Sequence, residues 1–377
     1  MRIRPYSLSL LALLATGASA EEQIVKIGHV GPLSGPIAHL GKDNENGARM
    51  AIDVLNAKGV TIGGKKVKFQ LFAEDDGANP QQATAVAQKL ADAKVVGVIG
   101  HLNSGTTIPA SKIYNDHGIP QISPSSTNPK YTQQGYKGAF RVVANDAQLG
   151  GALGRYAANS LKVKNIAIID DRTAYGQGVA DEFAKAAKAA GIRIVGRQYT
   201  NDKATDFNAI LTAIKGKSPD LVFFGGMDAV GGPMLRQMKQ LGVNVKFMGG
   251  DGICTEQLPA LAGTGMGDDQ VVCAEAGGVE ENQRKTMENF RADYRKKFGI
   301  DVKLYAPYVY DAVMVMADAM QRANSAEPAK YLPELAKSRY QGVTGLIEFD
   351  ARGDMKTGTL TLYTFRGGKR AQIAVVH

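Results

Sequence analysis

The chain has 377 residues, of which 44% are hydrophobic and 21% charged, a composition typical of a folded globular protein. Its formal net charge is +9, but the basic residues are interleaved with acidic ones and form no block with aromatic neighbours. This pattern is typical of a solvated surface and argues against a nucleic-acid partner. The length exceeds the size at which one hydrophobic core usually stops growing, so we expect two domains.

The first twenty residues have the pattern of an export signal. Arg2 and Arg4 give a positive start, residues 8–15 are a short apolar run, and Ala18-Ser19-Ala20 supplies the small residues of a cleavage site. The apolar run is too short to cross a bilayer. We therefore predict a cleaved signal peptide over residues 1–20 and a mature protein in the periplasm.

Two sets of short β-branched runs alternate with longer helical patterns, which indicates parallel α/β layers. In the first set, strands are predicted at residues 24–30, 67–73, 95–99 and 119–123, and helices at 41–57, 80–91 and 106–116. In the second set, helices are predicted at residues 147–161, 176–190, 206–215 and 232–241, and strands at 165–170, 192–199, 221–225 and 245–248. Two complete sets in series predict two doubly wound lobes.

The C-terminal segment has a different pattern. After a strand at residues 271–274, three helices are predicted with no strand between them, at 281–298, 305–323 and 328–338. Helices without strands of their own must pack on an existing sheet, so we expect this segment to return to the first lobe. Residues 346–349 and 359–365 are expected to pair with each other around the turn at 350–354.

These patterns predict an α/β protein of two Rossmann-like lobes. We expect the first lobe to comprise residues 21–143 and 275–353, and the second to comprise 144–274 and 354–377. A chain that crosses between lobes more than once makes a hinge of several strands, which suits domains that open and close.

Motifs of catalysis are missing from the sequence. It contains no GxSxG, HExxH, P-loop or strand-following GxGxxG pattern, and its five histidines lack metal-ligand spacing. We therefore expect a binding protein rather than an enzyme, with no cofactor and no metal. Cys254 and Cys273 also lack the CxxC spacing of a redox site; in an oxidising compartment they can form one disulfide, and the alternative is two free buried thiols.

Polar residues directly follow two predicted strands of the first lobe. Residues 100–106 follow one strand and open a helix, and residues 123–127 follow the next strand with three serines and a threonine. Open α/β sheets bind ligands at the carboxyl ends of their strands. Hydroxyls and free N–H groups at a helix start suit a carboxylate. Ser104 alone is better explained as a helix cap, but two such turns in one lobe favour a ligand carboxylate.

The second lobe offers a complementary acid. Asp251 lies within Gly249-Gly250-Asp251-Gly252 after a predicted strand, and Tyr175 lies within Ala174-Tyr175-Gly176. An acid among glycines can approach an ammonium group closely, although a turn aspartate is the alternative. A donor-rich lobe that faces an acid-bearing lobe predicts a receptor for a zwitterion, a free amino acid.

At these residues the sequence resembles the periplasmic leucine/isoleucine/valine-binding proteins of ABC importers, which have the type I periplasmic binding fold. The resemblance covers essentially the whole mature chain. It includes Gly31-Pro32-Leu33-Ser34-Gly35-Pro36, Asp75-Asp76, Asn79-Pro80, Val98-Ile99-Gly100-His101, Tyr175-Gly176-Gln177-Gly178, Phe224-Gly225-Gly226, Phe247-Met248-Gly249 and Phe349-Asp350 with Gly353-Asp354.

The resemblance implies roles for the residues at the head-group end of the site. Ser104 and Thr127 would contact the ligand carboxylate and amine with help from the Ser125 backbone. Tyr175 would close from the second lobe, and Asp251 would pair with the α-ammonium. The family typically has glutamate at the position of Asp251, so this chain keeps the charge on a shorter side chain.

The side-chain end of the site departs more from the family. Met227 stands where the family often has a tyrosine, Leu40 stands where it has an aromatic residue, and Tyr305 falls where an aromatic commonly lines the pocket. With Leu102 these residues form an apolar lining that favours a branched-chain or other apolar amino acid, whereas Asn103 would suit a polar side chain.

The resemblance also implies partners. The closed protein would dock on the ABC permease and ATPase complex in the inner membrane, and we expect it to be a monomer. One alternative is a receptor of the same fold for another small solute, such as an amide, urea or an aromatic acid, which needs no ammonium partner. Another is a sensory module that presents its ligand to a membrane receptor.

Overall fold

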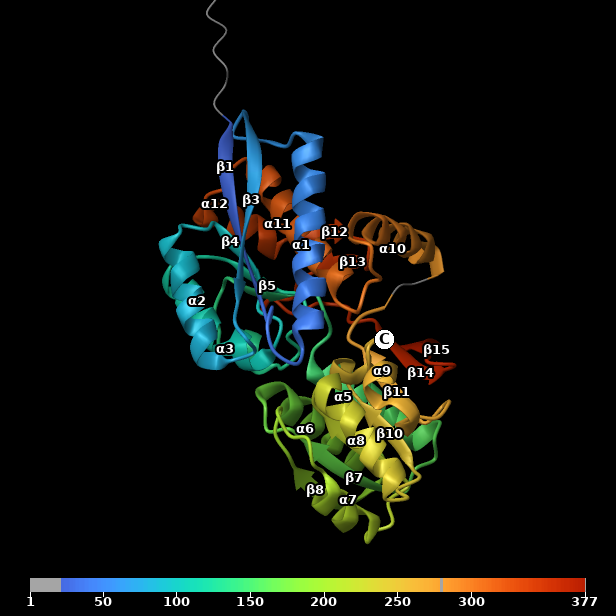
Figure 1. Ribbon diagram of the computed structural model, residues 1–377. Coiled ribbons are helices and arrows are strands. Elements are labelled where there is room, and N and C mark those ends of the chain that lie inside the picture. Colours follow the sequence, from blue (N-terminus) through green and yellow to red (C-terminus); the bar gives the residue numbers. More distant parts are fainter. Residues whose placement is uncertain (1–21, 279–280, 377) are drawn as a thin grey trace, which may run out of the picture.

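The computed structural model describes residues 22–278 and 281–376, so the predicted signal peptide lies outside the described residues. Two β-sheets with their flanking helices form two lobes, one above the other in Figure 1. A further two-stranded sheet belongs to the C-terminal segment. Among the described helices, none is long and apolar enough to cross a membrane.

The first lobe is built on a six-stranded sheet in the order β2-β3-β1-β4-β5-β6. Its strands are β1 (Gln23–Gly31), β2 (Thr61–Ile62), β3 (Lys65–Asp75), β4 (Gly97–Gly100), β5 (Gln121–Ser123) and β6 (Ala139–Arg141). All pairs are parallel except β2 with β3. The four predicted strands are present, and the short strands β2 and β6 were not predicted.

Two helix ends of this lobe have identifiable capping chemistry. The helices are α1 (Ala38–Lys58), α2 (Pro80–Asp92), α3 (Ser104–Asp116) and the single turn α4 (Lys130–Gln133). The Asn79 side chain accepts hydrogen bonds from two N–H groups at the start of α2, which also has Pro80 in its first turn. Gly59 ends α1 in the left-handed conformation that glycine adopts most readily.

The second lobe is built on a seven-stranded sheet in the order β15-β14-β11-β10-β9-β7-β8. Its strands are β7 (Asn165–Asp170), β8 (Arg193–Tyr199), β9 (Leu221–Gly225), β10 (Lys246–Gly249), β11 (Val271–Glu275), β14 (Leu360–Arg366) and β15 (Lys369–Val376). Its helices are α5 (Asp146–Asn159), α6 (Ala174–Ala189), α7 (Asn208–Lys215), α8 (Asp228–Gln240) and α9 (Leu258–Ala262), with short 3-10 turns at Asp251–Ile253 and Gly263–Gly265.

The predicted strand pair around residues 350–354 is wrong. The turn itself forms, because the Asp350 N–H donates to the Asp354 carbonyl at 2.8 Å. However, β13 (Leu346–Glu348) pairs with β12 (Arg339–Gln341), and β14 pairs with β11 and β15. The two strands belong to different sheets because the chain passes from one lobe to the other at this turn.

The helices of the C-terminal segment lie on the first lobe. They are α10 (Arg284–Phe298), preceded by a 3-10 turn at Glu281–Gln283, then α11 (Ala306–Arg322) and α12 (Pro328–Ala336). The carboxylate of Asp43 in α1 accepts the N–H groups of Leu304 and Ala306 at the start of α11. The Tyr331 hydroxyl of α12 donates to the carbonyl of Val96, which immediately precedes β4.

The chain crosses between the lobes three times, after β6, after β11 and after β13. The Ala144 N–H on the first crossing donates to the Ala276 carbonyl on the second at 2.8 Å. Adjacent crossings restrict the lobes to a hinge motion. The predicted architecture of two α/β lobes joined by a hinge of several segments is confirmed.

Cys254 and Cys273 form a disulfide with a Cα–Cα distance of 5.3 Å. It ties the chain just after the 3-10 turn at Asp251–Ile253 to β11, in the interior of the second lobe.

Reduction of this disulfide is expected to destabilise the protein. The bond closes a loop of 19 residues, and the loss of that constraint on the unfolded chain costs about 2–3 kcal/mol. Urea unfolding of the oxidised protein, the reduced protein and a Cys254→Ala/Cys273→Ala variant measures the difference. Identical peptide maps from reducing and non-reducing digests would show that the bond is absent.

Candidate ligand-binding site

The site lies where the carboxyl ends of the two sheets face each other. In each sheet the neighbours of the first strand lie on opposite sides of it: β3 and β4 flank β1, and β8 and β9 flank β7. The loops that follow such strands leave a crevice between them. We use the term cleft site for the ten predicted residues: Leu40, Leu102, Asn103, Ser104, Ser125, Thr127, Tyr175, Met227, Asp251 and Tyr305.

The two lobes are in contact across the cleft site. Side-chain hydrogen bonds join them, among them Tyr305 Oη to Asp251 Oδ2 at 2.8 Å, His39 Nε2 with Asp228 Oδ2 at 2.8 Å, and Asn128 Nδ2 to the Ala174 carbonyl at 2.6 Å. All cleft-site residues except Asn103 are buried. The structure is therefore the closed conformation of the two lobes.

Ser104 is oriented to donate its own hydroxyl proton. Asn103 is the N-cap residue of α3 and Ser104 is its first residue, so the capping alternative does not apply. The Ser104 Oγ accepts from the Asn128 N–H and from the Ser126 hydroxyl, each at 3.2 Å. Since both bonds use Ser104 as the acceptor, its hydrogen remains available to a ligand oxygen.

Replacing Ser104 with alanine is expected to weaken amino-acid binding by about 1–2 kcal/mol. The ligand carboxylate would lose one donor, while the rest of the turn keeps its bonds. Isothermal titration calorimetry gives the affinity, and a urea unfolding curve of the unliganded variant shows that the fold is intact. Wild-type affinity in a folded variant would remove Ser104 from the site.

Thr127 lies on the neighbouring turn, which follows β5, and is completely buried. Its hydroxyl makes no hydrogen bond of ordinary geometry within the described residues. Its carbonyl accepts the Asp146 N–H at 2.8 Å, which fixes the turn against the start of α5. Ser125 is held by a bond from its hydroxyl to the Leu102 carbonyl at 3.0 Å.

The acid of the second lobe is held by two tyrosines. Asp251 follows β10, and its two oxygens accept the hydroxyls of Tyr175 and Tyr305, each at 2.8 Å. Burial raises the pKa of Asp251 to about 6, and the bonds from Tyr305 and Tyr175 limit the rise. The carboxylate is thus fixed between the lobes and needs a cation to offset its burial.

Glycine is needed beside Asp251 because a larger residue would not fit. A Cβ atom on Gly252 would lie 2.6 Å from the Gly226 carbonyl oxygen and 2.9 Å from the Met227 sulfur. The Gly252 N–H also donates to the Tyr175 hydroxyl at 2.8 Å. Glycine at this position therefore lets the loops after β9 and β10 pack against Tyr175.

The four residues of the expected apolar lining are buried. Leu40, Leu102, Met227 and Tyr305 belong to a large hydrophobic cluster that extends through both lobes. They come from α1, the loop after β4, the start of α8 and the start of α11. Asn103 lies beside them, and its Oδ1 has no hydrogen-bond partner within the described residues.

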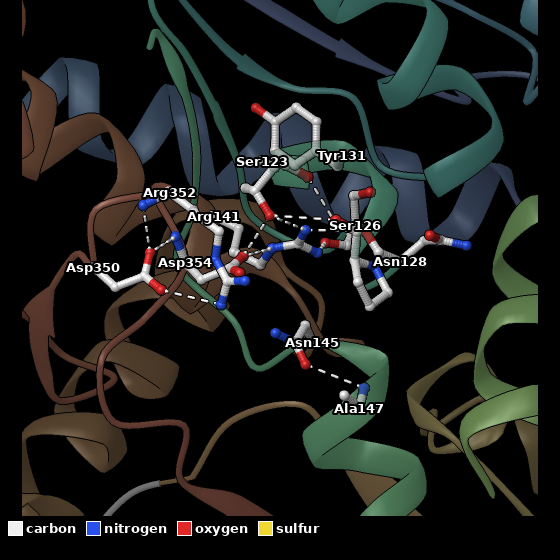
Figure 2. A network of polar contacts seen from close by, with 12 residues as sticks. Ser123, Ser126, Asn128, Tyr131, Arg141, Asn145, Ala147, Asp350, Arg352 and Asp354 are labelled. Carbon is white, nitrogen blue, oxygen red and sulfur yellow. Dashed lines mark hydrogen bonds and ion pairs between the residues drawn. The ribbon is translucent and has the colours of Figure 1, made fainter. Parts of the chain in front are cut away.

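A buried arginine that the sequence did not reveal supports the turn that carries Thr127. Arg141 in β6 donates through Nε to Asp354 Oδ1 at 2.7 Å, as Figure 2 shows. Its guanidinium also donates to the carbonyls of Ser126 and Asn128, the residues on either side of Thr127. Arg141 therefore holds this turn in place and ties it to the third crossing between the lobes.

Comparisons with known proteins show the family of this chain. Residues 24–369 match the family model described as periplasmic binding protein. The chain belongs to the periplasmic binding protein family.

Several relatives of this periplasmic binding protein match along almost its whole length. An "Amino acid binding protein" of Pseudomonas aeruginosa is 36% identical over 353 residues, 93% of this chain and 91% of the relative. A leucine-, isoleucine-, valine-, threonine- and alanine-binding protein of the same organism is 34% identical over 339 residues, 90% of this chain and 89% of the relative. The predicted resemblance to the leucine/isoleucine/valine-binding proteins is therefore confirmed.

A solved structure shows the same fold. The branched-chain amino acid transporter substrate-binding protein of Streptococcus pneumoniae, solved with isoleucine, has a TM-score of 0.84 and 27% identity. The alignment covers 94% of this chain and 99% of that one. The homologues are periplasmic proteins that bind solutes for ABC transporters, and the predicted compartment follows from that membership.

One buried histidine of this periplasmic binding protein has structural partners on both ring nitrogens. His101 is completely buried between Asp76 at 2.8 Å and the Tyr114 hydroxyl at 3.0 Å. In the described part of the chain, no group of three or more His, Cys, Asp or Glu side chains is arranged to hold a metal ion. The polar side chains of the cleft site are the hydroxyls of its serines, threonine and tyrosines, the amide of Asn103 and the carboxylate of Asp251.

Proposed function

We propose that this chain captures a free amino acid, branched-chain or otherwise apolar, by closing its two lobes and delivers it to the permease and ATPase complex of an ABC importer. One observation carries the proposal. Hydroxyl donors of the first lobe, Ser104 and Thr127, face a buried acid of the second lobe, Asp251. This arrangement complements a carboxylate and an ammonium at once, and burial strengthens both contacts.

The apolar lining supports the choice of side chain. Leu40, Leu102, Met227 and Tyr305 offer hydrocarbon and aromatic surface, and burial of apolar surface favours an aliphatic ligand by about 25 cal/mol per Å². The relatives agree with this: one is named for leucine, isoleucine, valine, threonine and alanine, and one was solved with isoleucine.

We infer the limits of the lobes from the three crossings. Residues 21–143 and 275–353 form the first lobe and residues 144–274 and 354–377 the second, with a signal peptide over residues 1–20. The mature protein acts as a monomer, because the ligand lies between two lobes of one chain.

A thermal-shift screen of the mature protein against the twenty amino acids, acetamide, urea and benzoate tests the function. A ligand at about 100 times its dissociation constant raises the unfolding free energy by about 2.7 kcal/mol. We expect leucine, isoleucine or valine to give the largest shift. A shift by an amide, urea or benzoate, with none by any amino acid, would favour the alternative solutes.

A further inference from the structure

A second carboxylate lies at the head-group end of the cleft site. Asp146 is the first residue of α5, directly after the first crossing, and its side chain is completely buried. Neither of its carboxylate oxygens has a hydrogen-bond partner of ordinary geometry within the described residues, although the Thr127 side chain is close enough to lower its pKa by hydrogen bonding. Its N–H is bonded to the carbonyl of Thr127, so the backbone of Asp146 is fixed beside the turn that binds the ligand.

The start of α5 does not need Asp146 as a cap. The Asn145 side chain accepts the N–H groups of Ala147 and Gln148, and the Gln148 side chain accepts the Asn145 N–H in return. Figure 2 shows the bond between Asn145 and Ala147. Because this reciprocal capping box already occupies these N–H groups, they do not need the Asp146 carboxylate as a hydrogen-bond acceptor.

The protein does not supply Asp146 with a cation. The charged and titratable groups that face it are Asp251, Glu182, Tyr175 and Arg141. Of these only Arg141 is positive, and its guanidinium is engaged by Asp354 and by two backbone carbonyls.

The space around Asp146 is part of the closed contact between the lobes. A Cβ atom on Gly178 of α6 would lie 2.6 Å from Asp146 Oδ2 and 2.6 Å from the amide nitrogen of Asn128, which bonds across the lobes. Burial raises the pKa of Asp146 to about 8, with a smaller contribution from the charge of Asp251, while Thr127 and Arg141 act in the opposite direction. A buried, unpaired carboxylate costs several kcal/mol, and a cation placed beside it removes that cost.

We propose that Asp146 is a second acidic acceptor for the ammonium group of the ligand and acts together with Asp251. The inference rests on the proposed function and refines it. An ammonium group has three N–H donors, so it can bond to Asp251, to Asp146 and to the Thr127 hydroxyl. Two acids at this end select a positively charged head group over a neutral one of the same shape.

The test compares two ligands of nearly equal shape. L-leucine carries an ammonium group, and 2-hydroxy-4-methylpentanoic acid carries a hydroxyl in its place. Calorimetry gives the affinity for leucine, and competition measured by ligand-observed NMR gives the weaker affinity for the hydroxy acid. We expect Asp146→Asn to weaken leucine binding by 10- to 100-fold and to change hydroxy-acid binding by less than threefold. The ratio of the two affinities is the readout.

Asp171→Asn is the matched control. Asp171 is also a buried carboxyl of the second lobe, but its Oδ1 accepts the N–H and the hydroxyl of Thr173. This variant should leave the ratio of the two affinities unchanged. Should Asp146→Asn not fold, Asp146→Ala is measured in the same way.

The outcomes separate the inference from the proposed function. Equal losses for the two ligands in the Asp146 variants, or no loss for either, would overturn the role of Asp146. Failure of the wild-type protein to bind any amino acid would instead overturn the proposed function. If the screen selects another amino acid, that amino acid and its 2-hydroxy analogue replace the leucine pair.

Discussion

Replacing Asp251 with alanine is expected to weaken amino-acid binding by roughly 2–4 kcal/mol, because a buried ammonium group loses its partner. The Asp251 carboxylate is held in position by Tyr175 and Tyr305, one from each lobe. The variant therefore loses both the charge and one of the bonds that join the closed lobes. Calorimetry with the amino acid selected by the screen measures the change.

Tyr305→Phe separates these two losses. It removes the hydrogen bond to Asp251 across the lobes but keeps the carboxylate and the aromatic lining. Its effect should be smaller, about 1 kcal/mol. If Asp251→Ala binds the amino acid as tightly as the wild type, the model of a zwitterion held between the lobes is wrong.

Acidification is expected to weaken amino-acid binding in the pH range in which Asp251 becomes protonated. Its pKa is raised to about 6, mainly by burial, and only the ionised form pairs with an ammonium group. Above pH 6 the carboxylate is charged and binds; below pH 6 it is protonated, and affinity falls by up to about tenfold per pH unit. Tyr175, Tyr305 and Asp146 also face this group, and Asp146, with a pKa of about 8, adds a shallower fall between pH 8 and 6.

Calorimetric titrations of the wild type and Asp251→Asn between pH 5 and 8.5 separate these contributions. The Asn variant should lack the fall centred near pH 6. A profile shared by both proteins would assign the pH dependence to another group.

Replacing Arg141 with methionine is expected to lower the free energy of unfolding by about 3–5 kcal/mol, because the change breaks a buried ion pair and leaves its partner unpaired. Asp354 would keep a buried charge without its cation, and the carbonyls of Ser126 and Asn128 would lose their donors. Urea unfolding of the unliganded protein measures the loss. Ligand affinity should fall as well, since these carbonyls flank Thr127.

A neighbouring pair provides the control for this prediction. Arg352 lies 3.5 Å from Asp350 in the same network (Figure 2), but its side chain is 60% exposed. Arg352→Met should change stability by at most about 1 kcal/mol, as is usual for an exposed ion pair. Similar losses in the two variants would contradict the view that burial makes Arg141 important.

Local patterns in the sequence were sufficient to predict most of the fold. Strands such as β7 and β9 were predicted with their observed limits, because buried parallel strands are continuous apolar runs that differ sharply from their flanks. The three-residue strand β6 was missed because it is too short to show a period. That omission concealed Arg141, which lies in β6, and Asp146, which begins the helix that follows the first crossing.

The position of a residue after a strand was also sufficient to nominate Ser104, Thr127 and Asp251, whereas the family resemblance nominated Leu40, Met227 and Tyr305. Parallel strands bring their carboxyl ends to one edge, so the turns that carry Ser104 and Thr127 had to be neighbours. The predicted pairing of β13 with β14 was wrong because closeness in the sequence does not place these strands in one sheet. Pairing across a turn looks local in the sequence, but these two strands lie on opposite sides of a crossing between lobes.

The sequence by itself determined the two α/β lobes, the hydroxyl-rich turns and the acid among glycines, because these depend on periodicity and on the chemistry of neighbouring residues. The tertiary structure alone decided which groups meet when the lobes close. It placed the Tyr305 hydroxyl on Asp251, the Arg141 guanidinium behind Thr127 and the unpaired Asp146 carboxylate beside it. These contacts join residues 15 to 213 positions apart or lie at a crossing between lobes, so no local pattern in the chain encodes them.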